Sequence, residues 1–207
     1  MTTIGNSNFS YEVSGTDWGQ LPSEWVYQEA TAVAVDSKDN AYVFNRGEHS
    51  IIVLSKEGKF LRSFGEGVFN FPHGISVGPD DSIYCADAGD HTIRKFDNDG
   101  KPLMTLGEKD NPSLPMSGKP FNSPTHIAVD HRNGNFYVSD GYSNARVHKF
   151  SPDGKLLFSW GESGTDPGKF NIVHNIAVDL NGWVYVADRE NRRTQVFNDK
   201  GEYETQW

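Results

Sequence analysis

The sequence predicts an all-β fold made of repeated four-stranded units, and three observations support this. A strand pattern ending in Ala-Val-Asp or a close variant recurs four times, at residues 31–36, 73–78, 125–130 and 174–179. Three further short runs, rich in β-branched and aromatic residues and separated by Asp, Asn and Gly turns, follow each copy. The copies lie 42, 52 and 49 residues apart, a spacing that indicates repeat architecture. Four short strands per unit are typical of the blades of a β-propeller.

Each strand of the unit is justified by the residues around it. The first is the repeated pattern itself. The second stops at Asn45, Asp87, Asp140 or Asp188, and we expect the three aspartates to be structural because an Asp there can accept from amides of the following turn. The third strands are expected at residues 51–54, 93–96, 147–150 and 194–197. The fourth, at residues 60–64, 103–106, 156–160 and 203–207, follow glycine turns that supply the positive φ such hairpins need.

One position of the first strand varies in a regular way. It reads Thr31, His73, Thr125 and His174 in successive units, and the first strand of every blade lines the central channel of a propeller. In a six-blade ring the two histidines would stand about 120° apart, and a histidine in a sixth unit would complete a trigonal set. Such a set with an open position suits a catalytic zinc. The plain alternative is that both histidines are channel-lining residues with satisfied hydrogen bonds.

The expected organisation is one propeller domain over residues 1–207, with blades at about 31–65, 73–107, 125–161 and 174–207. Residues 8–13 are expected to form an N-terminal outer strand that closes the last blade, which then lies outside this chain. We therefore expect a fragment of a six-bladed ring. Four blades that stand alone, or that pair with another copy through open edges, are the alternatives.

The remaining histidines and the single cysteine have ordinary interpretations. His126 lies one place after the variable position, so its ring is expected to point elsewhere. The others are expected in turns or on the surface: His49, His91, His131 and His148. Cys85 lies inside a strand and is expected to be a small core residue, and a lone cysteine excludes an intrachain disulfide.

Composition limits the partners. The 207 residues are 36% hydrophobic and 13% aromatic, which suffices for one core, and the net charge is −9. That charge disfavours nucleic acid or an anionic membrane as a partner. No apolar run approaches the roughly 18 residues of a membrane span, and the N-terminus lacks the regions of a signal peptide. A cytoplasmic, reducing compartment is the default expectation.

Six stretches carry a family resemblance. They include Asn-Arg-Gly-Glu-His at 45–49, Asp-Gly-Tyr-Ser-Asn-Ala-Arg at 140–146 and Asp-Arg-Glu-Asn at 188–191, and the other matching pieces are residues 71–75, 124–129 and 170–174. The units resemble NHL repeats. The whole chain resembles the amidating lyase that cleaves peptidyl-α-hydroxyglycine, the second half of the peptide-amidating enzyme, and more closely its bacterial relatives.

The resemblance implies roles for particular residues. His73 and His174 would be two of three zinc ligands, with the third histidine and a neighbouring aspartate in a late blade absent here. Tyr142 would be the catalytic phenol, and Arg46 and Arg189 would be cations at the channel mouth. A further implied feature is a structural calcium, held partly by the backbone carbonyls of Val33 and Ile75. Ser143 stands where the animal enzyme has a disulfide cysteine, which removes a covalent link and leaves the chemistry untouched.

These residue types suit that chemistry. A carbinolamide collapses to an amide and an aldehyde once its hydroxyl loses a proton and the departing nitrogen gains one. Zinc bound to that oxygen would lower its pKa. A tyrosine, whose ordinary pKa is about 10, becomes a usable base when metal or arginine charge lowers that value. Arg46 and Arg189 also suit a carboxylate product such as glyoxylate, through bidentate hydrogen bonds.

Each assignment has a plain alternative. Tyr142 lies in a turn one residue longer than its counterparts, so it can be a loop insertion without a role. Arg189 can serve a salt bridge with Glu190 or Asp188, and Arg46 can pair with Glu48.

Two functions of different classes follow. One is a metal-dependent lyase acting on an N-acyl or peptidyl α-hydroxyglycine. The other is an NHL-type propeller that holds a peptide or small acid at the same channel mouth without turnover. A propeller that binds RNA is disfavoured by 28 acidic against 19 basic residues.

Overall fold

The computed structural model describes residues 3–6, 8–13 and 17–207, and these residues form strands, turns and loops without a helix. Four antiparallel sheets of four strands each follow one another along the chain. Sheet 1 comprises β3 (Ala30–Val35), β4 (Ala41–Asn45), β5 (Ile51–Leu54) and β6 (Phe60–Phe64). Sheet 2 comprises β7 (Pro72–Val77), β8 (Ile83–Asp87), β9 (Thr92–Phe96) and β10 (Pro102–Leu106). Sheet 3 comprises β11 (Pro124–Val129), β12 (Phe136–Asp140), β13 (Arg146–Phe150) and β14 (Leu156–Trp160), and sheet 4 comprises β15 (Val173–Val178), β16 (Val184–Asp188), β17 (Arg193–Phe197) and β18 (Tyr203–Gln206).

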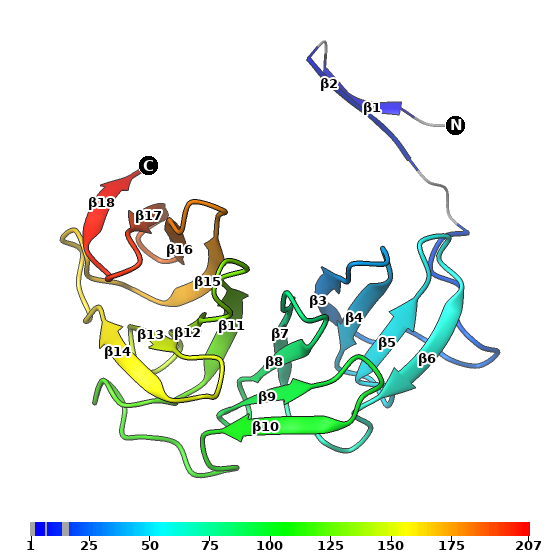
Figure 1. Cartoon of the computed structure of the whole chain (residues 1–207), viewed down its shortest axis with the longest axis horizontal. Coiled ribbons are helices and arrows are strands. Elements are labelled where there is room, and N and C mark those ends of the chain that lie inside the picture. Colours follow the sequence, from blue (N-terminus) through cyan, green and yellow to red (C-terminus); the bar gives the residue numbers. More distant parts are fainter. Residues whose placement is uncertain (1–2, 7, 14–16) are drawn as a thin grey trace.

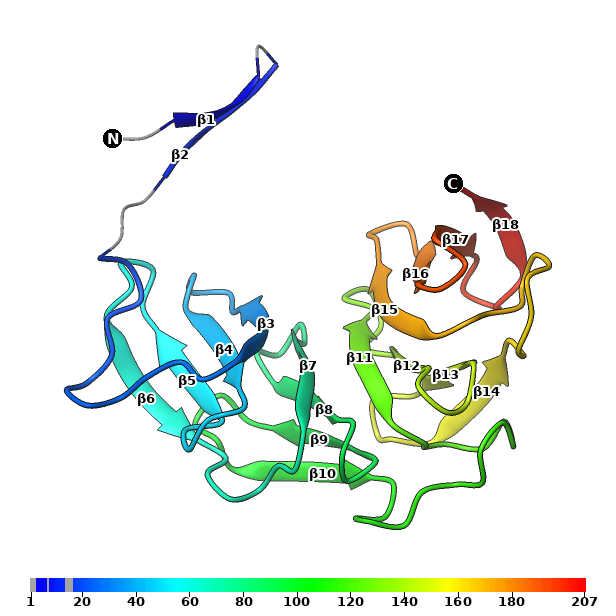
Figure 2. The same ribbon diagram turned by 180° about the vertical axis from the view of Figure 1, so that it is seen from behind.

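The sheets are arranged as an arc with their first strands on the inner side. β3, β7, β11 and β15 are neighbours in this order, and the fourth strands lie at the periphery (Figures 1 and 2). The all-β class and the repeated four-stranded sheet are thus confirmed. No described helix is long and apolar enough to cross a membrane.

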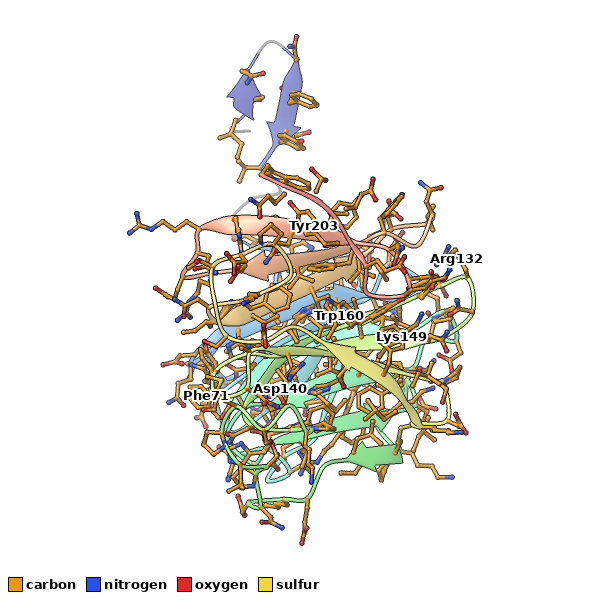
Figure 3. The ribbon with its side chains drawn as sticks, turned by 90° about the vertical axis from the view of Figure 1, so that its left-hand side faces the viewer. Phe71, Arg132, Asp140, Lys149, Trp160 and Tyr203 are labelled. Carbon is orange, nitrogen blue, oxygen red and sulfur yellow. The ribbon has the colours of Figure 1, made fainter. Side chains whose placement is uncertain are left out.

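The core lies between successive sheets. Each of the first three sheets directs the tyrosine of its second strand toward the next sheet, and Tyr42, Tyr84 and Tyr137 are 0%, 2% and 0% exposed. Sheets 3 and 4 are also joined through Trp160, which contacts the Phe197 ring, and through Lys149, whose ammonium donates to the carbonyl of Asp199 (Figure 3). Because each interface buries aromatic and aliphatic side chains on both sides, the hydrophobic effect holds successive sheets together.

The outer face of sheet 1 is covered by the chain segment that precedes it. Leu21 and Phe60 pack against a buried cluster of Val43, Ile52 and Leu54, and the indole of Trp18 donates to the Lys56 carbonyl at 3.0 Å. The segment that precedes β3 therefore shields this face of sheet 1.

The N-terminal strands form a small sheet of their own. β2 (Phe9–Glu12) pairs with β1 (Thr3–Asn6) in a separate two-stranded sheet that projects away from the four large sheets (Figures 1 and 2). In this chain β2 thus belongs to a local hairpin, and the role of residues 8–13 in closing a blade outside the chain stays a prediction. Pairing with a strand so near in sequence costs far less loop-closure entropy than pairing with a distant sheet.

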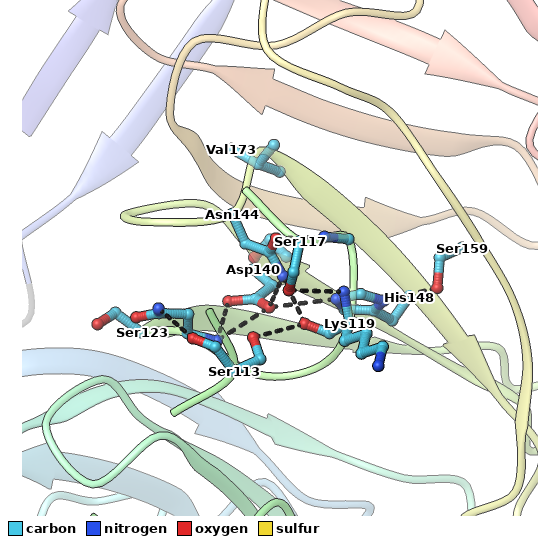
Figure 4. Close-up of polar contacts among 12 residues, drawn as sticks. Ser113, Ser117, Lys119, Ser123, Asp140, Asn144, His148, Ser159 and Val173 are labelled. Carbon is cyan, nitrogen blue, oxygen red and sulfur yellow. Dashed lines mark hydrogen bonds and ion pairs between the residues drawn. The ribbon is translucent and has the colours of Figure 1, made fainter. Parts of the chain in front are cut away.

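His148 was expected in a turn or on the surface, and that expectation is wrong. It lies in β13 at 0% exposure, with Nε2 3.2 Å from the Asp140 carboxylate and Nδ1 2.7 Å from the Ser159 hydroxyl (Figure 4). Cys85, in contrast, is buried in β8 as expected, and burial raises the pKa of its thiol.

Candidate active site

A β-bulge opens the first strand of every sheet at the position where the sequence varies. The register of pairing shifts across Thr31, His73, Thr125 and His174, each the second residue of its strand. A bulge leaves its extra residue unpaired and re-aims the side chain. The side chains of the four variable residues therefore do not follow the regular alternation between the two faces of the sheet.

Two of these residues meet the phenol of Tyr142. The hydroxyl of Tyr142 lies 3.0 Å from Nε2 of His73 and 3.1 Å from Nε2 of His174. The two imidazole centroids are 5.0 Å apart. The structure thus brings together three residues from sheets 2, 3 and 4 that are far apart in sequence.

The direction of these hydrogen bonds follows from the partners. Nδ1 of His73 lies 2.8 Å from the carbonyl of Thr125, which only accepts, so the neutral ring carries its proton on Nδ1. Nε2 of His73 is then an acceptor, and Tyr142 donates to it. The phenol oxygen is left to accept from Nε2 of His174. The three side chains form one directed chain that ends on a backbone carbonyl.

Burial keeps both imidazoles neutral near pH 7. The pKa of His73 is lowered to about 4, mainly by desolvation; the Thr125 carbonyl raises it, and the nearby His174, Arg46 and Arg189 contribute smaller lowering effects. Desolvation also lowers the pKa of His174, helped by Arg189. Neutral nitrogens of this kind can accept a proton or bind a metal.

The two arginines near this cluster, Arg46 and Arg189, have different partners. The guanidinium of Arg46 pairs with Glu29 at 2.7 Å, stacks over the Phe71 ring at 3.5 Å and donates to the Pro72 carbonyl. Pairing of Arg46 with Glu48 was the plain alternative, and the structure gives Glu29 as its carboxylate instead. Arg189 pairs with Glu190 at 2.9 Å, as its plain alternative had it, while its guanidinium also lies 5.5 Å from the centroid of the Tyr142 ring.

Tyr142 is presented by a turn that is held from two sides. On the inner side, Gly141 packs so closely on the backbone of Val173 that a Cβ there would overlap the Val173 carbonyl. On the outer side, the buried Asn144 donates to Asp140 at 2.8 Å and to the Lys119 carbonyl at 2.7 Å, and accepts from the Gly118 amide (Figure 4). The long loop between β10 and β11 therefore anchors the turn.

The aspartates that end the second strands tie each sheet to the loop that leads into it. Asp140 accepts from the Asn122 amide at 2.9 Å and Asp188 from the Asn171 amide at 2.7 Å. Asp87 accepts from the amides of Asn70 and Phe71 and also from Gly89 in the turn that follows it, and the bond with Gly89 is of the kind the sequence predicted. The backbone amides that Asp140 and Asp188 bind belong to the preceding loops instead. The side chains are structural, and they fix the loops that carry Phe71 and Thr125 into place.

The donor set fits a metal in part. His73 and His174 direct their Nε2 atoms at one point, of which that of His73 is unprotonated and that of His174 carries the proton donated to the phenol. His73 holds its other nitrogen on a carbonyl, the usual outer-shell partner of a ligating histidine. Among residues 3–6, 8–13 and 17–207, no group of three or more His, Cys, Asp or Glu side chains is placed to hold a metal. Val33 and Ile75 occupy the same register of β3 and β7, and calcium at their carbonyls stays a prediction.

Two glycines and a threonine contribute to this site although the sequence did not predict them as site residues. A Cβ on Gly74 would overlap the Thr125 carbonyl, so this glycine lets β7 approach β11 closely enough for His73 to reach it. Gly141 does the same for Tyr142, and Thr125 supplies the carbonyl. The variable position itself was the available signal for Thr125, whereas nothing in the local sequence distinguishes the two glycines.

Comparison with known proteins gives two kinds of match. The NHL repeat model matches residues 69–96 and 121–150. Peptidyl-glycine alpha-amidating monooxygenase B of Xenopus laevis is 32% identical over 91% of this chain and 25% of its own length. Peptidyl-alpha-hydroxyglycine alpha-amidating lyase 1 of Drosophila melanogaster is 32% identical over 93% of this chain and 44% of its own, and NHL repeat-containing protein 3 of Mus musculus is 36% identical over 89% and 56%. The chain spans about a quarter of the length of the monooxygenases it matches.

Solved structures show the fold. Virginiamycin B lyase from Staphylococcus aureus superposes with a TM-score of 0.64 at 15% identity, covering 96% of this chain and 58% of that chain. A streptogramin B lyase gives 0.61 at 18% identity, covering 84% and 53%. Both are β-propeller proteins, so the four sheets have the architecture of propeller blades.

Proposed function

Because this chain carries NHL repeats and is homologous to the peptidyl-α-hydroxyglycine amidating lyases, we propose that it is a lyase acting on an N-acyl or peptidyl α-hydroxyglycine. The observation that carries the proposal is the convergence of His73, His174 and Arg189 on the Tyr142 phenol. Homology supports a lyase of this type, and the cluster supplies residues suited to proton transfer.

The chain's own residues account for the proton movements of such a reaction. Tyr142, with His73 accepting from it, is placed to take the proton of the substrate hydroxyl. The phenol passes its own proton to Nε2 of His73 as it takes this one. The carbon–nitrogen bond then breaks, its electron pair leaves with the amide nitrogen, and the proton held by the Tyr142–His73 pair is delivered to that nitrogen. The products are an amide and glyoxylate. Arg46 and Arg189 hold the carboxylate shared by substrate and glyoxylate.

His73 and His174 would hold a zinc ion, which supplies Lewis-acid stabilisation of negative charge on oxygen when bound. The backbone carbonyls of Val33 and Ile75 would contribute to a structural calcium, since calcium prefers oxygen ligands. We further propose that the four sheets belong to a ring of six, because the arc shown in Figures 1 and 2 leaves β3 and β15 apart.

Turnover of α-hydroxyhippurate tests the proposal. The purified chain, with zinc supplied, is expected to release benzamide and glyoxylate in equal amounts, and a chelator should stop the reaction. His73→Ala and His174→Ala should each abolish turnover, with circular dichroism as the check on folding. Absence of product with and without zinc and calcium would overturn the assignment.

A binding propeller without turnover is the second candidate. The similarity to NHL repeat-containing protein 3, of which the chain covers 56%, favours it because that name specifies repeats and no reaction. A scaffold should keep its peptide or small-acid ligand when His73, His174 and Tyr142 are replaced, whereas a lyase should lose its activity.

A further inference from the structure

Thr125 occupies the variable position between the two histidines, and it contacts the supports of both. Its carbonyl accepts from Nδ1 of His73 at 2.8 Å. Its hydroxyl lies 3.1 Å from the carbonyl of Val173, the residue before His174. Thr125 is 0% exposed, so water does not compete for these bonds.

The same carbonyl of Val173 is the surface on which Gly141 packs. The Val173 carbonyl of β15 therefore contacts both Thr125 and the turn that carries Tyr142. Because His174 follows Val173 directly, any shift of this carbonyl changes the distance from His174 to the phenol.

Thr31 shows which part of this arrangement the repeat itself requires. In sheet 1 the Thr31 hydroxyl donates to the Phe44 carbonyl at 3.2 Å, across to the second strand of its own sheet. In sheet 3 the Thr125 hydroxyl has the corresponding partner in the Ser139 carbonyl at 3.1 Å, and it lies 2.8 Å from the Ser139 hydroxyl. The contact with Val173 is the addition, because it crosses to the next sheet. A single hydroxyl proton shared between two carbonyls is a three-centre bond, and the Ser139 hydroxyl can donate to the Thr125 oxygen at the same time.

We propose that Thr125 is a positioning residue that sets the spacing of His73, Tyr142 and His174. Its carbonyl fixes the tautomer of His73, so that Nε2 stays free. Its hydroxyl fixes the backbone of β15, so that His174 faces the same point. The inference rests on the proposed function for its consequence in metal binding and turnover, whereas the spacing itself is a property of the fold.

Three substitutions test it. Thr125→Val keeps the shape and the carbonyl but removes the hydroxyl, Thr125→Ser keeps the hydroxyl, and Thr31→Val is the matched control that loses only the bond within a sheet. Long-range ¹H–¹⁵N spectra of the histidine side chains report tautomer and environment without any assay of activity. Calorimetric titration with zinc chloride reports whether the two imidazoles still act together.

In Thr125→Val we expect the His174 imidazole signals to move while His73 keeps its proton on Nδ1, because the carbonyl at position 125 remains. Zinc affinity should fall about tenfold, because the backbone that carries His174 loses its bond to the hydroxyl. Thr125→Ser should restore both, and Thr31→Val, which loses a single bond of a partly buried hydroxyl, should leave both unchanged. His174 signals and zinc affinity in Thr125→Val equal to those of Thr31→Val would overturn the proposal. If the unaltered chain binds no zinc and turns nothing over, the proposed function fails, and the imidazole spectra alone decide the role of Thr125.

Discussion

At the scale of single residues, the Tyr142 phenol has a defined role in a hydrogen-bond chain before any substrate arrives. Its proton lies toward His73, because the Thr125 carbonyl fixes the tautomer of that ring. His174 donates to the same oxygen from the other side. For both histidines to bind a metal through Nε2, His174 must move its proton to Nδ1. Metal binding by both histidines therefore requires one proton to move from Nε2 to Nδ1 of His174.

Removal of the phenol hydroxyl tests the assigned base. Tyr142→Phe keeps the ring beside Arg189 and should lower kcat/KM for α-hydroxyhippurate by about 100-fold or more, the usual contribution of general base catalysis. The urea midpoint should change little, because the ring packing is preserved. Turnover that survives the substitution would remove Tyr142 from the chemistry.

His126 makes the fold sensitive to acid. Burial lowers the pKa of His126 to about 4, with the neighbouring His73 as a smaller cause, and its Nδ1 is buried without a partner. The unfolded chain, whose histidine pKa is about 6.5, binds more protons, so stability is lost as pH falls from about 6.5 toward 4.

The share of His126 should be about 2 kcal/mol between pH 7.5 and pH 5. Urea unfolding at both pH values measures it in the unaltered chain and in His126→Asn, which carries the residue that sheet 4 has at this position, Asn175. The loss on acidification should be smaller in the variant, and an equal loss would show that His126 is not the sensitive group.

At the scale of elements, the turn between β12 and β13 is one residue longer than its equivalent in sheet 4, but an asparagine anchors both turns in the same way. Asn144 links this turn to the loop from β10, and Asn191 makes the corresponding bonds in sheet 4, to Asp188 at 2.8 Å and to the Gly164 carbonyl at 2.9 Å. The extra residue of the sheet 3 turn is accommodated between Asp140 and Asn144, and Ala145 takes a positive φ of 53°. The same anchor thus supports a longer turn that carries Tyr142 inward.

Close approach at Gly141 is the second requirement of this turn. Gly141→Ala introduces a methyl group that overlaps the Val173 carbonyl, so we expect a cost of about 1–3 kcal/mol together with displacement of Tyr142. Gly67→Ala is the control. Alanine at this position also costs stability, because the φ of Gly67 is 71°, but the added methyl group has open space around it.

Zinc titration separates the two glycine variants. Gly141→Ala should weaken binding, while Gly67→Ala should lower the urea midpoint and leave binding intact. Equal zinc affinity in both would mean that the approach of the turn to β15 does not set the site.

At the scale of the whole molecule, every sheet has one face that carries the tyrosine of its second strand. In sheet 4 no further sheet of the described part of this chain covers that face. The tyrosines of the first three sheets are covered by the next sheet, whereas Tyr185 of sheet 4 is half-buried and contacts the ring of Trp207, which is 68% exposed. Its cross-strand partners on this face are uncharged: Ala177, Val196 and Thr205. An exposed apolar sheet face of this kind promotes association.

In a solution of this chain alone, a second copy is the available cover. We therefore predict self-association through sheet 4, measured as the concentration dependence of sedimentation velocity. Trp207→Lys should shift the equilibrium toward monomer, and Leu180→Lys, at an exposed turn residue away from this face, should not. A chain that sediments as a monomer at all concentrations would contradict the prediction.

The sequence by itself determined the repeated four-stranded sheet. Alternating β-branched and aromatic residues between glycine turns specify each strand locally, and the strand-ending aspartates specify where loops attach. The register of the repeats also selected His73 and His174, because equivalent positions of equivalent units lie on equivalent strands. All of this depends on short-range pattern, which one chain displays without further information.

Only the tertiary structure decided how these residues meet. That Tyr142 lies between the two histidines depends on three sheets packing together, and on Gly74 and Gly141 being small enough to permit it. The burial of His148 and the pairing of Arg46 with Glu29 likewise depend on which surfaces are near one another. Contacts across more than 30 residues of sequence are set by packing between sheets, and no local pattern encodes their distances.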